Sequence, residues 1–344
     1  MVNFDICNLL FDLCGANGTP GDENDIAEKA MKYLNEFMPC RRDALGSVIG
    51  KKEGKGINIL LDAHMDRIGL TVTAVDDKGF LRVAKCGGAD ARVMSASEVT
   101  VFGKEKLYGV VTSIPPHLAS KDEENKAAAF EDVCIDIGLN GEKARELVTP
   151  GDRIIFNGPS ARLCGDRVVS PAVDDRAGMA AILRCLEILK ESGKETCSIT
   201  VMFSSQEETG GSGAQAGSFG VDADEAIAVD VGFALAPGIK EQQAGKLGGG
   251  AQIGFSPIID EDMCAALVSL AEDNGIKWQY DVMGGKTGTN GDEIQVSAGG
   301  VKTALISIPI RNMHTNVETV SLGDIEAVAR LMAAYILERS GENA

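Results

Sequence analysis

The sequence predicts an α/β protein: a three-layer α/β/α sandwich whose chain is interrupted by a small, β-barrel-like insertion. Two observations predict this architecture. After residue 170, short apolar stretches alternate with amphipathic stretches of helical period, which is the pattern of an α/β sandwich. From about residue 70 to 165, the chain instead consists of short β-rich pieces separated by glycine turns, typical of a small β-barrel or β-sandwich.

The first elements of the sandwich precede the insertion. Residues 22–39 predict a helix, because acidic residues fall in its first turn and apolar residues recur at helical spacing. Residues 57–66, INILLDAHMD, form a short apolar run that ends in polar residues, as expected of a buried strand. We therefore assign residues 1–70 and 166–344 to one α/β domain and residues 71–165 to the inserted β-rich domain.

The remaining elements alternate in type. Helical spacing of apolar residues predicts three helices after the insertion, over residues 176–192, 260–274 and 321–339. Continuous apolar runs predict the strands between them, over residues 197–205, 225–231 and 302–310. Inside the insertion, only residues 141–148 have the pattern of a helix.

Composition excludes several classes of function. The 344 residues carry a net charge of -18, which disfavours nucleic acid as a partner because its phosphates would be repelled. No apolar run approaches the ~18 residues of a membrane-spanning helix, and the N-terminal residues lack the basic segment of a signal peptide. The nine cysteines are scattered without a C-x-x-C pair, which favours reduced thiols and a cytoplasmic protein.

Acidic residues and histidines gather at the ends of apolar stretches. Only three histidines are present, and two of them end such a stretch. Five apolar stretches end in this way, at His64, at Asp174, at the pair Glu207–Glu208, at Asp230 and at His314. A single acid in this position is usually a turn residue or a helix cap. Five together favour a shared site, because ligands collect at the strand ends of α/β sheets.

The residue types in this set predict a metal centre. Imidazole and carboxylate ligands without cysteine suit Zn, Co or Mn at a hydrolytic site. Two divalent ions would bring four positive charges, against three negative charges from Asp174, Glu208 and Asp230. A carboxylate that bridges ions ~3.5–4 Å apart is the usual way to hold such a pair. We therefore expect a two-metal site.

Two further carboxylates have predicted roles beside the ligands. In the pair at 207 and 208, adjacent side chains point in different directions, so one can bind metal while the other acts as general base. We predict that Glu208 is the metal ligand and that Glu207 is the general base. Asp66 lies two residues after His64, hence on the same side of an extended strand, where it would accept the spare imidazole N–H. The alternative for Asp66 is a solvated strand-end residue.

Five short motifs occur in a characteristic order: AHMD, VDDRAG, QEETGGSGA, AVDVG and RNMHTNVE. With the β-rich insertion after the first of them, and IPPH at 114–117 within it, the chain resembles the M42 family of metallo-aminopeptidases, which includes tetrahedral and glutamyl aminopeptidases. The resemblance covers essentially the whole chain. It implies a zinc-exopeptidase-like fold for the catalytic α/β domain and a cis peptide bond between Asp174 and Asp175.

The resemblance also implies how the site residues divide between two metal ions. It places His64 and Asp230 on one ion, Glu208 and His314 on the other, and Asp174 between them. Glu207 would be the general base and Asp66 the residue behind His64. It further implies a homododecamer built from dimers, with the inserted domain at the dimer contacts.

We therefore expect a cytosolic aminopeptidase that uses two divalent metal ions, Zn, Co or Mn, to remove N-terminal residues from short peptides. The alternatives are a related metal-dependent deacylase or carboxypeptidase, and a catalytically inactive shell homologue. Three features depart from the family pattern and leave the preferred substrate open: Pro171, Asn290 and the RNM that precedes His314. His117, in the insertion, is expected to be a structural or interface residue instead of a third metal ligand.

Overall fold

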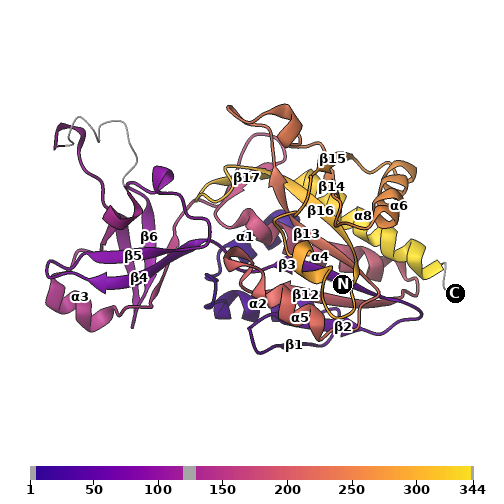
Figure 1. Ribbon diagram of the computed structural model, residues 1–344, viewed down its shortest axis with the longest axis horizontal. Coiled ribbons are helices and arrows are strands. Elements are labelled where there is room, and N and C mark those ends of the chain that lie inside the picture. The colour runs from indigo at the N-terminus through magenta and orange to yellow at the C-terminus, as the bar shows by residue number, and fades with distance from the viewer. Residues whose placement is uncertain (1–4, 119–128, 342–344) are drawn as a thin grey trace.

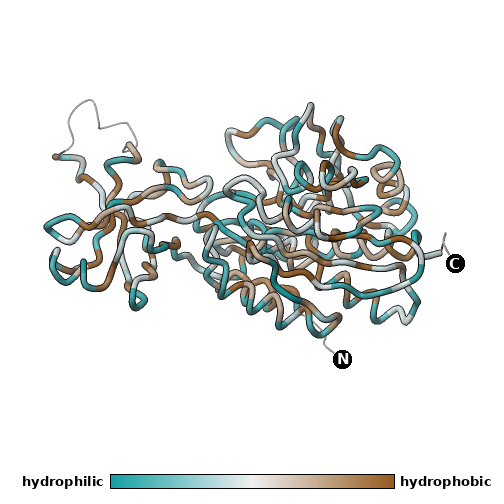
Figure 2. Tube along the Cα trace, turned by 60° about the horizontal axis from the view of Figure 1, so that its bottom comes forward, coloured by the Kyte–Doolittle hydropathy of each residue, from teal (hydrophilic) through white to brown (hydrophobic). Residues whose placement is uncertain are grey.

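The computed structural model describes residues 5–118 and 129–341. Two bodies lie side by side in both views, a layered α/β domain and a smaller β domain (Figures 1 and 2). Hydrophobic and hydrophilic stretches alternate along the trace of both bodies in Figure 2. No helix in the described part of the chain combines the length and hydropathy needed to cross a membrane.

The α/β domain is built on one mixed sheet. Its main path runs in the order β1-β2-β12-β3-β13-β16-β17-β11-β10, and β14 pairs with β15 and β16 off this path. The bounds are β1 Cys40–Arg42, β2 Val48–Lys52, β3 Asn58–His64, β10 Ala161–Arg162, β11 Arg167–Ser170, β12 Ser198–Ser204, β13 Glu225–Phe233, β14 Ala251–Phe255, β15 Trp278–Val282, β16 Lys302–Arg311 and β17 Glu318–Ser321. The central strands β12, β3, β13 and β16 are parallel, so their carboxyl ends share one edge.

Helices cover both faces of this sheet, which makes the three layers. On one face, α4 packs against α1 and α8, and on the other α5 and α7 pack against β12, β13 and β16. The helix bounds are α1 Ile6–Cys14, α2 Asn24–Leu34, α4 Val173–Ser192, α5 Ser212–Phe219, α6 Glu261–Asp273, α7 Gly291–Ile294 and α8 Leu322–Gly341. Strand β3 shows the alternation directly: Ile59 and Leu61 join the core under α4, whereas Leu60 joins the core under α5 and α7.

The inserted domain is a closed barrel with its own core. Its strands follow the order β4-β5-β8-β7-β6-β9, with bounds β4 Gly69–Val75, β5 Leu81–Cys86, β6 Glu98–Phe102, β7 Lys106–Val111, β8 Cys134–Asp136 and β9 Arg153–Phe156. Leu70, Val99 and Ile135 are fully buried inside it, and the short helix α3, Gly141–Leu147, contacts β4. Of the two forms that the sequence allowed for this segment, the structure has the barrel.

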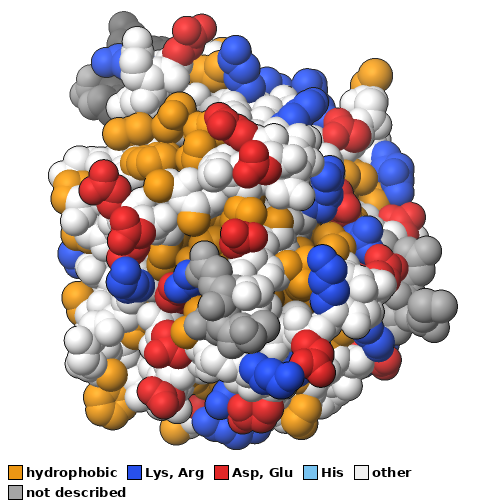
Figure 3. All heavy atoms as spheres, turned by 90° about the vertical axis from the view of Figure 1, so that its right-hand side faces the viewer, with side chains coloured by type: hydrophobic (Ala, Val, Ile, Leu, Met, Phe, Trp, Pro, Cys, Tyr) orange, Lys and Arg blue, Asp and Glu red, His pale blue; other side chains and the backbone are white. Residues whose placement is uncertain are grey.

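The predicted fold class is confirmed, and the predicted long elements lie where the sequence placed them. The largest difference is at residues 22–39, where α2 ends at Leu34 and the chain continues as turns. All nine cysteines are free. On the face drawn in Figure 3, acidic and basic side chains are interspersed, so the net negative charge does not form a single acidic field there.

Candidate metal centre

The topology explains why the six predicted residues converge. His64 is the last residue of β3, Glu207 and Glu208 form the turn that follows β12, and Asp230 lies near the end of β13. These three strands are parallel neighbours. Asp174 lies in the first turn of α4, which follows β11, and His314 lies between β16 and β17, so both are brought to the same edge.

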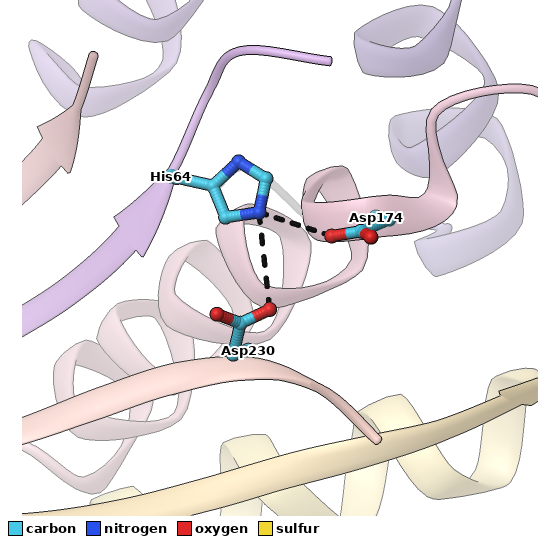
Figure 4. A group of neighbouring side chains, drawn as sticks. All are labelled: His64, Asp174 and Asp230. Atoms are coloured by element: carbon cyan, nitrogen blue, oxygen red, sulfur yellow. Dashed lines mark hydrogen bonds and ion pairs between the residues drawn. The ribbon is translucent and has the colours of Figure 1, made fainter. Parts of the chain in front are cut away.

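The first group of possible metal ligands is His64, Asp174 and Asp230, all buried. Nε2 of His64 lies 3.0 Å from Oδ1 of Asp174 and 3.8 Å from Oδ1 of Asp230. In Figure 4 the imidazole points between the two carboxylates, which come from the start of α4 and from β13. One possible ligand atom from each residue lies within 4.8 Å of those of the other two, which is close enough for the three to hold one ion.

The second group is Asp174, Glu208 and His314. Nε2 of His314 lies 3.2 Å from Oδ2 of Asp174 and 3.4 Å from Oε1 of Glu208. Asp174 therefore belongs to both groups, and its two oxygens face different histidines. A carboxylate in this position has the geometry needed to bridge two ions.

Glu207 belongs to neither group but lies next to them. Its Oε2 is 4.0 Å from Nε2 of His64, and its side chain lines a cleft of about 540 Å³ together with Asp174, Glu208, Asp230 and His314. Burial raises the pKa of Glu207 above its ordinary value, even though His64 opposes the shift. An acid with a raised pKa at the side of such a cleft is suited to accept and release a proton.

Asp66 lies beside His64 and has further partners that the sequence did not suggest. Nδ1 of His64 lies 3.0 Å from the backbone oxygen of Asp66, whereas the nearest carboxylate oxygen is 3.6 Å away. The carboxylate instead accepts the backbone N–H groups of Glu207 and Glu208, at 2.9 and 3.1 Å. The Asp66 carboxylate thus remains at ion-pair distance from the ring, and its role behind His64 stays a prediction.

The electrostatics of the cluster fit divalent cations. Burial, together with the charge of Asp174, raises the pKa of Glu208 to about 8, and burial raises the pKa of Asp230 well above its usual range. The hydrogen bond with Asp174 raises the pKa of His314 to about 9. Burial is the main cause of the raised carboxylate pKa values, and a divalent cation bound there would favour the ionised carboxylates. The donor set of imidazole nitrogens and carboxylate oxygens, without thiols, suits Zn, Co or Mn.

The inserted domain contributes two residues that the sequence did not single out. A Cβ on Gly88 would lie 2.3 Å from Nδ1 of His314, and a Cβ on Gly87 would lie 3.0 Å from Oε2 of Glu208. Both glycines follow β5, so the barrel closes one side of the site. The doublet GG in the sequence was the only sign of this close approach.

Two other predicted features have defined places. His117 lies in an exposed turn of the inserted domain and in neither group of possible ligands among the described residues. Asn290 is buried, and its amide donates to Oδ2 of Asp62 at 2.9 Å and to the hydroxyl of Ser204 at 2.7 Å. It therefore braces β3 against β12 behind the site. The bond between Asp174 and Asp175 is cis, as expected.

Comparisons with known proteins agree with this geometry. Residues 46–331 match the family model of the M42 glutamyl aminopeptidases. The chain is 34% identical to a lysyl aminopeptidase of Pyrococcus furiosus, over 98% of each chain. Among solved structures, it is similar to a TET aminopeptidase from a marine sediment thaumarchaeon, with a TM-score of 0.92, 28% identity and coverage of 98% and 99%. It is also similar to the TET1 peptidase of Pyrococcus horikoshii, described as assembling into a tetrahedron or a large octahedral shell, with a TM-score of 0.86, 32% identity and coverage of 96% and 99%.

Proposed function

The chain belongs to the M42 glutamyl aminopeptidase family, and we propose that it removes N-terminal residues from short peptides with two divalent metal ions bound per subunit. One observation carries this proposal. Two histidine–carboxylate groups share Asp174, whose two oxygens lie 3.0 Å from His64 and 3.2 Å from His314. The free carboxylate of Glu207 stands beside them in the cleft.

The roles of the site residues follow from their positions. His64 and Asp230 would hold one ion, Glu208 and His314 the other, with Asp174 between them. Bound there, divalent ions would polarise the scissile carbonyl and make water more acidic. Glu207 would take a proton from water and pass it to the leaving amine, since its pKa is raised by burial and it belongs to neither ligand group. Asp66 would hold Glu207 and Glu208 in place through their backbone N–H groups.

We further propose that the enzyme is a cytoplasmic homododecamer built from dimers, with the inserted barrel at the dimer contacts. Exposed apolar side chains on that domain support such a contact: Val93, Tyr108, Ile114 and Leu118 are 50–71% exposed. The assembly described for the TET1 peptidase of P. horikoshii supports a large shell. Nine free cysteines fit a reducing compartment.

A panel of aminoacyl-p-nitroanilides, assayed with Zn, Co and Mn and combined with metal analysis, tests the proposal. We expect two ions per chain and turnover that disappears with a strong chelator. The most active metal and the preferred first residue emerge from the same panel. A protein that binds no divalent ion, or that turns over no substrate with any of the three metals, would be an inactive shell homologue instead.

A further inference from the structure

One buried carboxylate outside the predicted set contacts two of the proposed ligands. Glu318 is 2% exposed. Its Oε2 accepts the backbone N–H of Asp174 at 3.0 Å, and its Oε1 accepts the backbone N–H of His314 at 2.8 Å. A single side chain therefore ties together the main chain of the shared ligand and that of a ligand to the second group.

Neither of these backbone positions is held by regular secondary structure. Asp174 is the second residue of α4 and has non-helical dihedral angles, and N–H groups in the first turn of a helix have no partner within it. His314 has φ of 61°, in the left-handed region that residues with a side chain rarely adopt, at a cost of about 1–3 kcal/mol. A hydrogen-bond acceptor from elsewhere is needed to keep both residues in place.

The sheet puts Glu318 where it can serve both. It is the first residue of β17, which lies between β16 and β11 in the sheet order. Glu318 itself pairs with Ser170, the last residue of β11, from which the chain runs on to Asp174. On the other side, β16 leads into the loop that carries His314. The strand register therefore fixes the carboxylate between the two ligand segments.

The negative charge of Glu318 has a buried counterpart in Arg67. The guanidinium is 3% exposed and its charge acts on Glu318, while its Nη2 donates to the backbone oxygen of Phe156 in the inserted domain. Burial and the charge of Asp174 raise the pKa of Glu318 to about 8, and the charge of Arg67 opposes that rise. Each of the two carboxylate oxygens accepts one backbone N–H.

We propose that Glu318 is a positioning residue for the metal pair: by holding the backbone of Asp174 and His314, it sets how tightly the two ions bind. This inference rests on the proposed function, since it takes both residues to be ligands. Partners behind the ligands commonly change metal affinity by ~10–100-fold when they are replaced. Because His314 belongs only to the second group, its ion should be weakened most.

The same domain offers a matched control for a purely structural role. Asp324 is also a buried carboxylate that accepts two backbone N–H groups, those of Gly248 and Gly250, both at 2.7 Å. It contacts no residue of either ligand group in the described structure. Replacing each acid by its amide makes the same chemical change in the two places. A loss of metal affinity in Glu318→Gln alone would therefore come from the contacts of Glu318 with the two ligand segments.

The test is a calorimetric titration of the metal-free full-length chain with Co²⁺, for wild type, Glu318→Gln and Asp324→Asn. We expect the weaker of two Co²⁺ affinities to fall ~10–100-fold in Glu318→Gln and to stay near wild type in Asp324→Asn. Excess Co²⁺ should restore much of the turnover of Glu318→Gln, because Glu207 is untouched.

Two results would overturn the inference: wild-type Co²⁺ affinities in Glu318→Gln, or equal losses in both variants. Should Glu318→Gln not fold, Glu318→Asp carries the same comparison, since it keeps the charge but shortens its reach by one methylene, and unchanged Co²⁺ binding by it would reject the inference. A wild-type chain that binds no Co²⁺ would instead overturn the proposed function itself.

Discussion

The carboxylate of Asp66 accepts the backbone N–H of Glu207 at 2.9 Å, and its other oxygen accepts that of Glu208 at 3.1 Å. The turn that carries both glutamates is therefore held at its start by Asp66, a fully buried acid that follows the neighbouring strand β3. Asp66 and Glu318 act alike in this respect. Each uses one carboxylate to hold two backbone N–H groups, and together they hold Glu207, Glu208, Asp174 and His314.

Asp66→Asn tests this relationship. The amide can accept one of the two N–H groups but must turn its own NH₂ toward the other, which leaves a buried donor without an acceptor, at a cost of about 1–3 kcal/mol. We expect the Glu207–Glu208 turn to shift and turnover at saturating Co²⁺ to fall by ~10-fold or more. Turnover and bound metal both equal to wild type would contradict this role for Asp66.

Glu207→Gln separates proton transfer from metal binding. The amide keeps the size of the side chain but cannot accept a proton from water, so we expect both metals to be retained and turnover to fall by ~10²-fold or more. Metal analysis of the purified variant provides the control. Near-wild-type activity in a fully metal-loaded variant would reject Glu207 as the general base.

Gly88→Ala tests the contribution of the inserted domain to the site. The added Cβ would lie 2.3 Å from Nδ1 of His314, so the imidazole or the loop has to move. We expect weaker metal binding at the group containing His314, and lower turnover, with the barrel still folded. Gly138→Ala is a suitable control within the same domain, because a Cβ there meets nothing within 4 Å, although its φ of 71° adds backbone strain. Equal effects of the two variants on metal binding would show that the contact with His314 is unimportant.

The gathering of the ligands could be predicted because it depends on topology alone. Apolar runs marked the central strands, alternation with helices indicated that they are parallel, and parallel strands end at one edge of a sheet. His64, Glu208 and Asp230 follow from that reasoning without knowledge of any side-chain contact. The hydrogen bonds of Asp66 to the backbone of Glu207 and Glu208 could not be predicted in the same way, because they depend on the turn that follows β12.

Glu318 and Gly88 could not be found in this way, because their importance comes from pairings between distant segments. In the sequence, Glu318 closes the motif RNMHTNVE but has no assigned role, and only the β16–β17–β11 order places it between two ligands. Gly88 belongs to a different domain from the histidine that it must avoid. No local pattern of polarity or turn residues carries that information.

Asp324 makes a prediction about pH. Burial raises its pKa to about 6 in the folded protein, against about 3.9 in an unfolded chain. Between these values the folded state holds a proton that the unfolded state has lost. The free energy of unfolding should therefore decrease as pH rises from 4 to 6, by about 1.4 kcal/mol per pH unit from this group, and show no further change from it above that range.

Asp324→Asn removes this titration. Urea unfolding of wild type and variant at several pH values, both in chelator so that metal binding does not contribute, gives the difference between their free energies of unfolding. We expect the advantage of the wild type to shrink between pH 4 and 6. A constant difference over this interval would show that the pKa of Asp324 is at its ordinary value, and a growing one that it is lowered; either contradicts the prediction.

The last prediction concerns the restriction to chain ends. An α-amino group is a cation near neutral pH and a lone-pair donor when it is deprotonated. The buried carboxylates of the cleft, Asp230 and Glu208 among them, offer a favourable field to the first form, and ions held by the two ligand groups could receive the second. An acetylated amine has neither property, so its peptide would lose the anchor that aligns the scissile carbonyl. Loss of one charged anchor typically costs a few kcal/mol, or roughly a hundredfold or more in rate.

We therefore expect a free tri- or tetrapeptide to be shortened from its N-terminus one residue at a time, and its N-acetyl form to be nearly inert. Incubating both peptides with Co-loaded enzyme and following their masses over time measures this directly. A related carboxypeptidase would remove the last residue of either peptide, and a deacylase would release the acetyl group first. Faster loss of acetyl than of the first residue would exclude aminopeptidase action as the main activity, because the cleft would then favour a blocked amine over a charged one.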